Sequence, residues 1–144
     1  MAKVNPYINF KGTCEEAFNF YKSVFGGEFM GEKMTWDGVD CGQPLPDSAQ
    51  GKIMHIALPI GEGSVIMGSD YVEGFGPPFQ EGNNYSVAIG PDSKEQADNL
   101  YAGLSAGGQE TMPMADAFWG GYFGSLTDKF GIQWLLNYDD NQKV

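Results

Sequence analysis

The feature that most constrains the fold of this chain is an internal repeat. The fourteen residues from Glu15 to Glu28 align without gaps with residues 95–108, and five of these fourteen positions are identical. The identical pairs are Glu15/Glu95, Ala17/Ala97, Asn19/Asn99, Tyr21/Tyr101 and Gly27/Gly107. Apolar residues recur in both segments at helical spacing, and a pair of glycines ends each one. The sequence therefore predicts two equivalent helices at an offset of 80 residues.

Both predicted helices begin with a hydroxyl residue. Thr13 stands three residues before Glu16, and Ser93 stands three residues before Gln96. This spacing is typical of a capping box, in which the hydroxyl and the acid or amide satisfy free backbone N–H groups of the first turn. We expect the side chains of Thr13 and Ser93 to cap the two helices.

The segments around the helices repeat as well. A short strand-like run precedes each helix, a strand segment follows it, and a hairpin comes after a loop. The runs are 4–10 and 85–89, the following strands 28–36 and 109–114, and the hairpins 53–60 with 64–67 and 121–127 with 132–136. Each half is thus predicted to be a βαβββ module of an α+β protein. The modules cover residues 1–75 and 76–144 and form one structural domain.

The charge of the chain excludes several classes of protein. The sequence has 19 acidic residues, eight lysines and no arginine, which gives a net charge of −11. Nucleic-acid binding and docking on anionic lipid both need a basic surface, so we expect neither partner. No run approaches the ~20 apolar residues of a membrane span, and the N-terminus lacks a signal-peptide core. With Cys14 and Cys41 far apart, these features favour a soluble cytoplasmic protein with reduced thiols.

The sequence resembles the vicinal oxygen chelate superfamily, which includes glyoxalase I, extradiol dioxygenases and bleomycin-resistance proteins, and in particular its PhnB-like branch. The segments that carry the resemblance are 5–10, 16–21, 24–28, 53–55 and 118–134. The resemblance implies two half-barrel sheets that enclose a cavity, and chains that pair as homodimers.

Metal-dependent members of this superfamily hold a divalent ion with His, Gln or Glu from the first and last strands of each module. Carried over to this chain, those positions fall near Pro6, Met67 or Ser69, Ser86 and Leu135, and a shift of one residue brings in Tyr7, Gly68 or Tyr85. None is a carboxylate or an imidazole, the groups that such ions need. The only histidine, His55, lies on a strand that does not normally supply a ligand. We therefore expect no metal ion and no cofactor.

Six residues are candidates for ligand binding, and each also has a structural interpretation. They are Tyr7, His55, Phe118, Trp119, Tyr122 and Trp134. The histidine is either a hydrogen-bonded core residue or the one cavity side chain that titrates near neutral pH. The large aromatic residues either fill the half-barrel or line a ligand slot beside glycines, to which the tyrosines add hydroxyl groups. Asp128 is expected to open a turn, and Cys14 to be structural.

The sequence leaves three functions open. The first is metal-free binding of a small amphipathic or aromatic molecule in the cavity, and the acidic charge favours a cationic one. The second is an enzyme of the same superfamily, of the glyoxalase or lyase, isomerase or dioxygenase type, with unconventional metal ligands or with His55 as general base. The third is an interaction module whose cavity is filled by its own aromatic residues. No catalytic residue can be assigned, and no nucleotide or adenosylmethionine motif is present.

Overall fold

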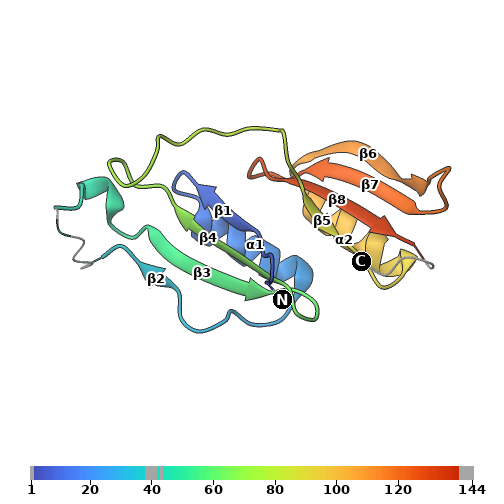
Figure 1. The fold of residues 1–144 in the computed structure, drawn as a ribbon, viewed down its shortest axis with the longest axis horizontal. Coiled ribbons are helices and arrows are strands. Elements are labelled where there is room, and N and C mark those ends of the chain that lie inside the picture. Colours follow the sequence, from blue (N-terminus) through green and yellow to red (C-terminus); the bar gives the residue numbers. More distant parts are fainter. Residues whose placement is uncertain (1, 38–41, 43, 140–144) are drawn as a thin grey trace. The chain divides into compact units, whose positions relative to one another are not determined.

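The chain divides into two compact units, Met1–Gln80 and Glu81–Val144 (Figure 1). The structure is a computed structural model that describes residues 2–37, 42 and 44–139. Cys41, one of the two cysteines, lies outside the described residues.

The first unit is a four-stranded sheet with one α-helix packed against it (Figure 1). Its elements are β1 (Tyr7–Phe10), α1 (Cys14–Phe25), β2 (Met34–Thr35), the short 3₁₀ helix η1 (Asp47–Ala49), β3 (Ile53–Pro59) and β4 (Val65–Asp70). The strand order is β1-β4-β3-β2, with β1 parallel to β4 and the other neighbours antiparallel.

The second unit repeats this plan. Its elements are β5 (Val87–Ile89), α2 (Lys94–Ser105), β6 (Gln109–Asp116), β7 (Tyr122–Thr127) and β8 (Gln133–Tyr138). The order β5-β8-β7-β6 is that of the first sheet, and the first and last strands are again parallel. Both α-helices have 12 residues and begin 80 positions apart. The predicted α+β class and the two βαβββ modules are confirmed.

Each helix buries its apolar stripe against one face of its own sheet. In the first unit Phe18 is fully buried, and it lies so close to β4 that a Cβ on Gly68 would be 2.7 Å from its ring. In the second unit Leu104 of α2 is buried together with Trp134 and Leu136 of β8. Successive side chains along a strand point to opposite faces of the sheet. Each sheet therefore has a second face that does not contact its helix, and we call this the open face.

The capping prediction is confirmed for α2. The Ser93 hydroxyl oxygen accepts a hydrogen bond from the Gln96 N–H at 3.0 Å. The Gln96 side-chain oxygen accepts in turn from the Asp92 N–H at 2.6 Å.

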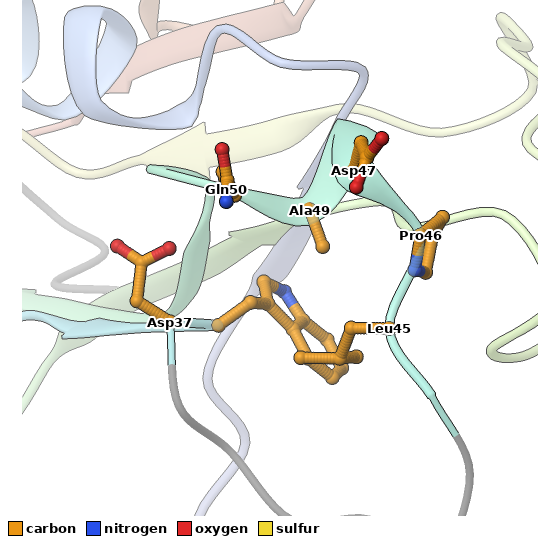
Figure 2. A pocket seen from close by; sticks show the side chains of 7 residues that line it. Asp37, Leu45, Pro46, Asp47, Ala49 and Gln50 are labelled. Carbon is orange, nitrogen blue, oxygen red and sulfur yellow. The ribbon is translucent and has the colours of Figure 1, made fainter.

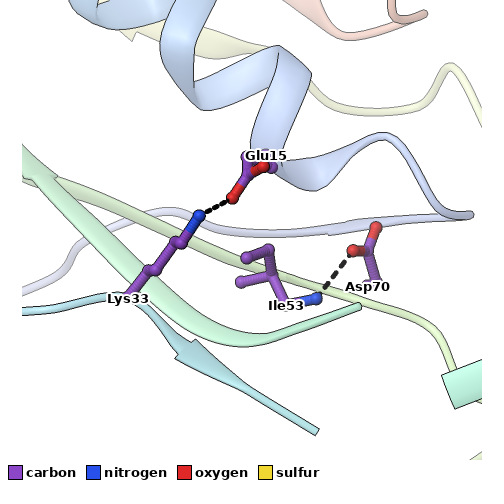
Figure 3. Close-up of polar contacts among 4 residues, drawn as sticks. All are labelled: Glu15, Lys33, Ile53 and Asp70. Carbon is purple, nitrogen blue, oxygen red and sulfur yellow. Dashed lines mark hydrogen bonds and ion pairs between the residues drawn. The ribbon is translucent and has the colours of Figure 1, made fainter. Parts of the chain in front are cut away.

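The capping prediction is wrong for α1, where the Thr13 side chain makes no capping hydrogen bond. The carboxylate of Asp70, at the end of β4, takes this place and accepts from the Cys14 N–H at 2.9 Å. Its other oxygen accepts from the Ile53 N–H at 2.9 Å (Figure 3). An ionised acceptor held rigidly by a strand is a stronger partner for the helix N-terminus than a hydroxyl group.

The strand predicted over 28–36 is reduced to Met34–Thr35 (β2), with isolated backbone hydrogen bonds from the Met30 N–H to Ala57 and from the Trp36 N–H to Lys52. Gly31, inside the predicted strand, has a positive φ angle of 69°, and this backbone conformation cannot continue a strand. The strand predicted over 109–114 is confirmed and extends to Asp116. Among the described residues, no helix combines the length and the apolar character needed to cross a bilayer.

Candidate ligand-binding site

In the first unit, the open face of the sheet carries polar and aromatic groups. Ile8 and Phe10 of β1 are buried, so Tyr7 and Asn9 point to the other side. The Tyr7 ring, 47% exposed, stacks on the imidazole of His55 from β3, with centroids 6.0 Å apart and planes at 26°. Nearby, the Ser69 hydroxyl donates to the Asn9 side-chain oxygen at 3.3 Å. Two of the sequence-predicted residues, Tyr7 and His55, are therefore brought together.

In the second unit, Tyr122 belongs to the helix side of the sheet. Its hydroxyl donates to the Asp98 carboxylate of α2 at 2.6 Å, and the Lys94 ammonium group lies 5.1 Å from the ring centroid. The hydrogen bond to Asp98 is the main cause that raises the pKa of the Tyr122 phenol, because the neutral form is the donor. The Tyr122 side chain thus contacts two residues of α2, Asp98 and Lys94.

Three aromatic side chains gather on the opposite side. Phe123 follows Tyr122 in β7, so it points to the open face. The Trp119 ring meets Phe123 edge to face at 5.7 Å, and Phe118 meets Trp119 in the same way at 5.1 Å. Phe118 is 99% exposed and Trp119 52% exposed. We refer to Phe118, Trp119 and Phe123 as the aromatic row.

An unpaired acceptor lies beside the aromatic row. Asn137 of β8 is paired with Phe123, so both lie on the open face. Its side-chain oxygen is buried and accepts no hydrogen bond within the described part of the chain. A Cβ on Gly121 would come within 2.6 Å of both this oxygen and the Trp119 indole nitrogen. The absence of a side chain at Gly121 therefore lets the indole and the amide approach each other.

Trp134, another predicted ligand contact, is a core residue under α2. It is fully buried, and its indole N–H donates to the Asp128 carboxylate at 2.9 Å. The other oxygen of Asp128 accepts from the N–H groups of Phe130 at 2.8 Å and Ile132 at 3.0 Å. The predicted turn at Asp128 is confirmed, and the same carboxylate fixes the Trp134 ring.

The predicted site residues are thus distributed over the two units. Tyr7 and His55 lie in the first unit, on the open face of its sheet. Phe118 and Trp119 lie together in the second unit, in the aromatic row. Tyr122 and Trp134 lie on the helix side of that second sheet. A single cavity that all six share stays a prediction.

The donor groups on the two open faces do not fit a divalent metal ion. The first and last strands of the first unit present Tyr7, Asn9, Met67 and Ser69 there, and those of the second unit present Ala88, Leu135 and Asn137. A zinc-type ion needs imidazole, thiolate or carboxylate ligands, and hard ions need carboxylates. Among the described residues, no three His, Cys, Asp or Glu side chains are grouped so that they could hold an ion.

Cys14, at the start of α1, lies away from these faces. It is fully buried, and burial, followed by the negative charges of Asp70 and Glu15, strongly raises the pKa of its thiol. A thiol with a raised pKa is a poor nucleophile at neutral pH. The structural role predicted for Cys14 agrees with this environment.

A pocket in the first unit was not predicted from the sequence (Figure 2). It has a volume of about 410 Å³. The described residues that line it are Trp36, Asp37, Leu45, Pro46, Asp47, Ala49 and Gln50. The one sequence signal was a tryptophan followed by an aspartate at the start of a loop rich in proline and acidic residues.

Comparison with known proteins identifies the family. The family model described as 3-demethylubiquinone-9 3-methyltransferase matches residues 2–137. Protein PA1353 from Pseudomonas aeruginosa is 32% identical, with a TM-score of 0.83, over 96% of this chain and 98% of that one. A PhnB protein from Bacillus cereus, described as a putative 3-demethylubiquinone-9 3-methyltransferase, is 25% identical, with a TM-score of 0.73, over 95% and 99%.

A more distant structure shares the fold alone. A glyoxalase/bleomycin resistance protein/dioxygenase family enzyme from Burkholderia phytofirmans is 18% identical, with a TM-score of 0.61, over 94% of this chain and 98% of that one. The chain therefore belongs to the 3-demethylubiquinone-9 3-methyltransferase family, is similar to a PhnB protein, and has the fold of a glyoxalase/bleomycin resistance/dioxygenase family enzyme.

Proposed function

We propose that this chain binds a small aromatic or amphipathic molecule without a metal ion, and that the aromatic row is the main contact surface. The observation that carries the proposal is the exposure of Phe118 and Trp119 on the open face of the second sheet. Large aromatic side chains in contact with water lose the stabilisation that burial would give them. A contiguous group of such side chains is typical of a binding surface.

The geometry of the row suits a planar ligand. Phe118 and Trp119 meet edge to face, with their planes at 85°, so their faces are not stacked on each other. Aromatic faces that remain open can stack on a flat ligand, and the polar amide of Asn137 lies next to the indole of Trp119. Pockets for small molecules commonly combine aromatic walls with a few polar groups of this kind.

The charge of the chain favours a cationic ligand. With a net charge of −11 the chain attracts cations over a distance, and added salt screens this attraction. On the first unit, the stacked Tyr7 and His55 rings are the proposed ligand contacts. We infer a cytoplasmic location from the two unclustered cysteines.

The reaction named in the family description requires a methyl donor. The loops that lead from a strand into a helix, where a nucleoside-containing methyl donor would be expected to bind, do not fit such a cofactor. The strand-to-helix loops contain one glycine each, Gly12 and Gly90, rather than a glycine-rich sequence. One N–H group in the first turn of each helix is already bonded, that of Cys14 to Asp70 and that of Gln96 to Ser93. We therefore assign no methyl-transfer step, and the described residues on the open faces provide no ligand set for a metal-dependent reaction.

Replacement of Trp119 tests the proposal. Thioflavin T, a planar cationic dye, is expected to bind the unmodified chain, and Trp119→Ala should weaken this binding by about fivefold, because one aromatic contact contributes about 1 kcal/mol. The free energy of unfolding should fall by only about 1 kcal/mol, since half of the side chain is already in water. Dye fluorescence and chemical denaturation measure the two effects.

Trp134→Phe is the matched control. It leaves the Asp128 oxygen without its indole donor, so it should lower the free energy of unfolding by about 1–3 kcal/mol and leave dye binding unchanged. If Trp134→Phe weakened dye binding while Trp119→Ala did not, the aromatic row would be excluded as the binding surface. Dye binding that required added nickel or zinc would contradict the metal-free part of the proposal.

A further inference from the structure

The pocket beside Trp36 is a second candidate binding site, remote in sequence from the aromatic row. Its volume of about 410 Å³ lies in the range of small-molecule pockets. All of its described lining belongs to the first unit, from the end of β2 to the turn before β3. Figure 2 shows Asp37 on one side of it, and Leu45, Pro46 and Asp47 on the other.

The surface that Trp36 presents to the pocket is hydrocarbon. The residue is half-buried, yet its indole nitrogen is fully buried and has no hydrogen-bond partner among the described residues. The accessible part of the ring therefore consists of carbon atoms and their π-electrons. The ring of Phe75 packs against the Trp36 indole, with the ring centroids 5.5 Å apart.

The polar part of the pocket is acidic. Asp37 and Asp47 line it, and no lysine is among its described lining residues. One oxygen of Asp37 accepts from the Gly51 N–H at 2.9 Å, which holds the carboxylate in place, and no ion pair joins it to a lysine of the described residues. Two carboxylates beside an indole form an environment that attracts a positive charge.

We propose that this pocket binds a small organic ammonium ion, such as a quaternary amine. A quaternary ammonium group donates no conventional hydrogen bond, and its methyl groups pack well on an indole, on Leu45 and on Pro46. The negative charges of Asp37 and Asp47 attract the ammonium group without having to touch it. A metal ion is a poorer fit, because it would need several oxygen ligands where this pocket offers ring carbon and aliphatic groups.

Choline chloride is the probe, and its neutral carbon isostere, dimethylbutanol, is the matched control ligand. Binding is followed on the full chain by the NMR signal of the Trp36 indole N–H, which is assigned from its loss in Trp36→Phe. Choline should shift the Trp36 signal in a saturable manner, and dimethylbutanol should not. The Trp119 signal should stay in place, which separates this site from the aromatic row.

The double variant Asp37→Asn/Asp47→Asn tests the role of charge. Asparagine at position 37 keeps an acceptor for Gly51, so the loop is expected to remain folded. Each lost charge, taken as about 5 Å from the ammonium ion in water, should weaken choline binding about fourfold. The control Glu62→Gln/Glu95→Gln removes the same net charge elsewhere and should have little effect.

Three outcomes would overturn the proposal. The first is equal binding of choline and dimethylbutanol, which would show that charge plays no part. The second is a shift of the Trp119 signal without a shift of the Trp36 signal, which would place the cation at the aromatic row. The third is no movement of the Trp36 signal at millimolar choline.

Discussion

Each unit contains one buried carboxylate that cross-links separate parts of that unit. Asp70 joins the start of α1 to the start of β3 through the N–H groups of Cys14 and Ile53. Asp128 joins the turn before β8 to the indole of Trp134. Asp70 is the last residue of β4, and Asp128 directly follows β7. Both residues are almost completely buried. A buried charge is tolerated when it accepts several hydrogen bonds, so each of these side chains acts as a small cross-link.

The Asp70 carboxylate also affects its neighbour Cys14, and this leads to a prediction about pH. Burial and the Asp70 charge raise the pKa of the Cys14 thiol in the folded chain far above its unfolded value of about 8.5. Above that pH the unfolded chain loses a proton that the folded chain keeps, so the free energy of unfolding falls as pH rises. The slope should reach about 1.4 kcal/mol per pH unit for this one group.

Chemical denaturation of the unmodified chain and of Cys14→Ala, at several pH values from neutral to alkaline, measures this contribution. The difference in stability between the two chains should shrink as pH rises through the alkaline range, because alanine has no proton to lose. A difference that stays constant with pH would mean that the thiol ionises equally in both states. Below the unfolded pKa the contribution of Cys14 should be fully present.

At the scale of elements, the two helix starts give a matched comparison. The Ser93 hydroxyl caps α2, whereas the Thr13 side chain makes no capping bond. Ser93→Ala should therefore lower the free energy of unfolding by about 1 kcal/mol, and Thr13→Ala should change it by less than about 0.5 kcal/mol. Thermal or chemical denaturation of both variants checks the difference. Equal losses would mean that Thr13 supports α1 in a way that the geometry does not show.

The elements that local chemistry determines were predictable from the sequence. Helical spacing and glycine stops indicated α1 and α2 with the correct offset, and strand-like runs on either side of short loops indicated both hairpins. The cap of α1 could not be predicted, because its acceptor, Asp70, is 56 residues away in the sequence. The strand expected before Met34 failed, because Gly31, which has a positive φ angle, interrupts the extended backbone.

The candidate site was predictable in part, for a related reason. A sequence shows which residues are aromatic, but the face on which each one lies depends on register. The sequence alone did not indicate that Phe123 and Asn137 are neighbours on the open face, because this depends on the pairing of β7 with β8. Trp134 carries the same chemistry as Trp119, yet register turns it toward α2. The Trp36 pocket depends on a loop packing against a strand end, which no periodic pattern indicates.

At the scale of the whole molecule, the two units share a strand order but differ in their open faces. The first sheet presents a phenol and an imidazole in a stack, whereas the second presents the aromatic row. Apart from Asp70 and Asp128, the described buried positions under the two helices are apolar. The repeat therefore preserves the scaffold, and the differences lie in the side chains that carry function.

The exposed strand edges motivate the last prediction, that two chains pair as a homodimer. β6 is an edge strand of eight residues, nearly all exposed, and its Met112 is 54% exposed. A long exposed edge with an apolar side chain is a surface that proteins usually cover. Light scattering at micromolar concentration should give the mass of two chains, and Met112→Lys should shift the mass toward one, because a lysine on an edge strand opposes pairing. A mass of one chain for the unmodified protein would contradict pairing, and an unchanged mass in Met112→Lys would exclude the β6 edge as the route.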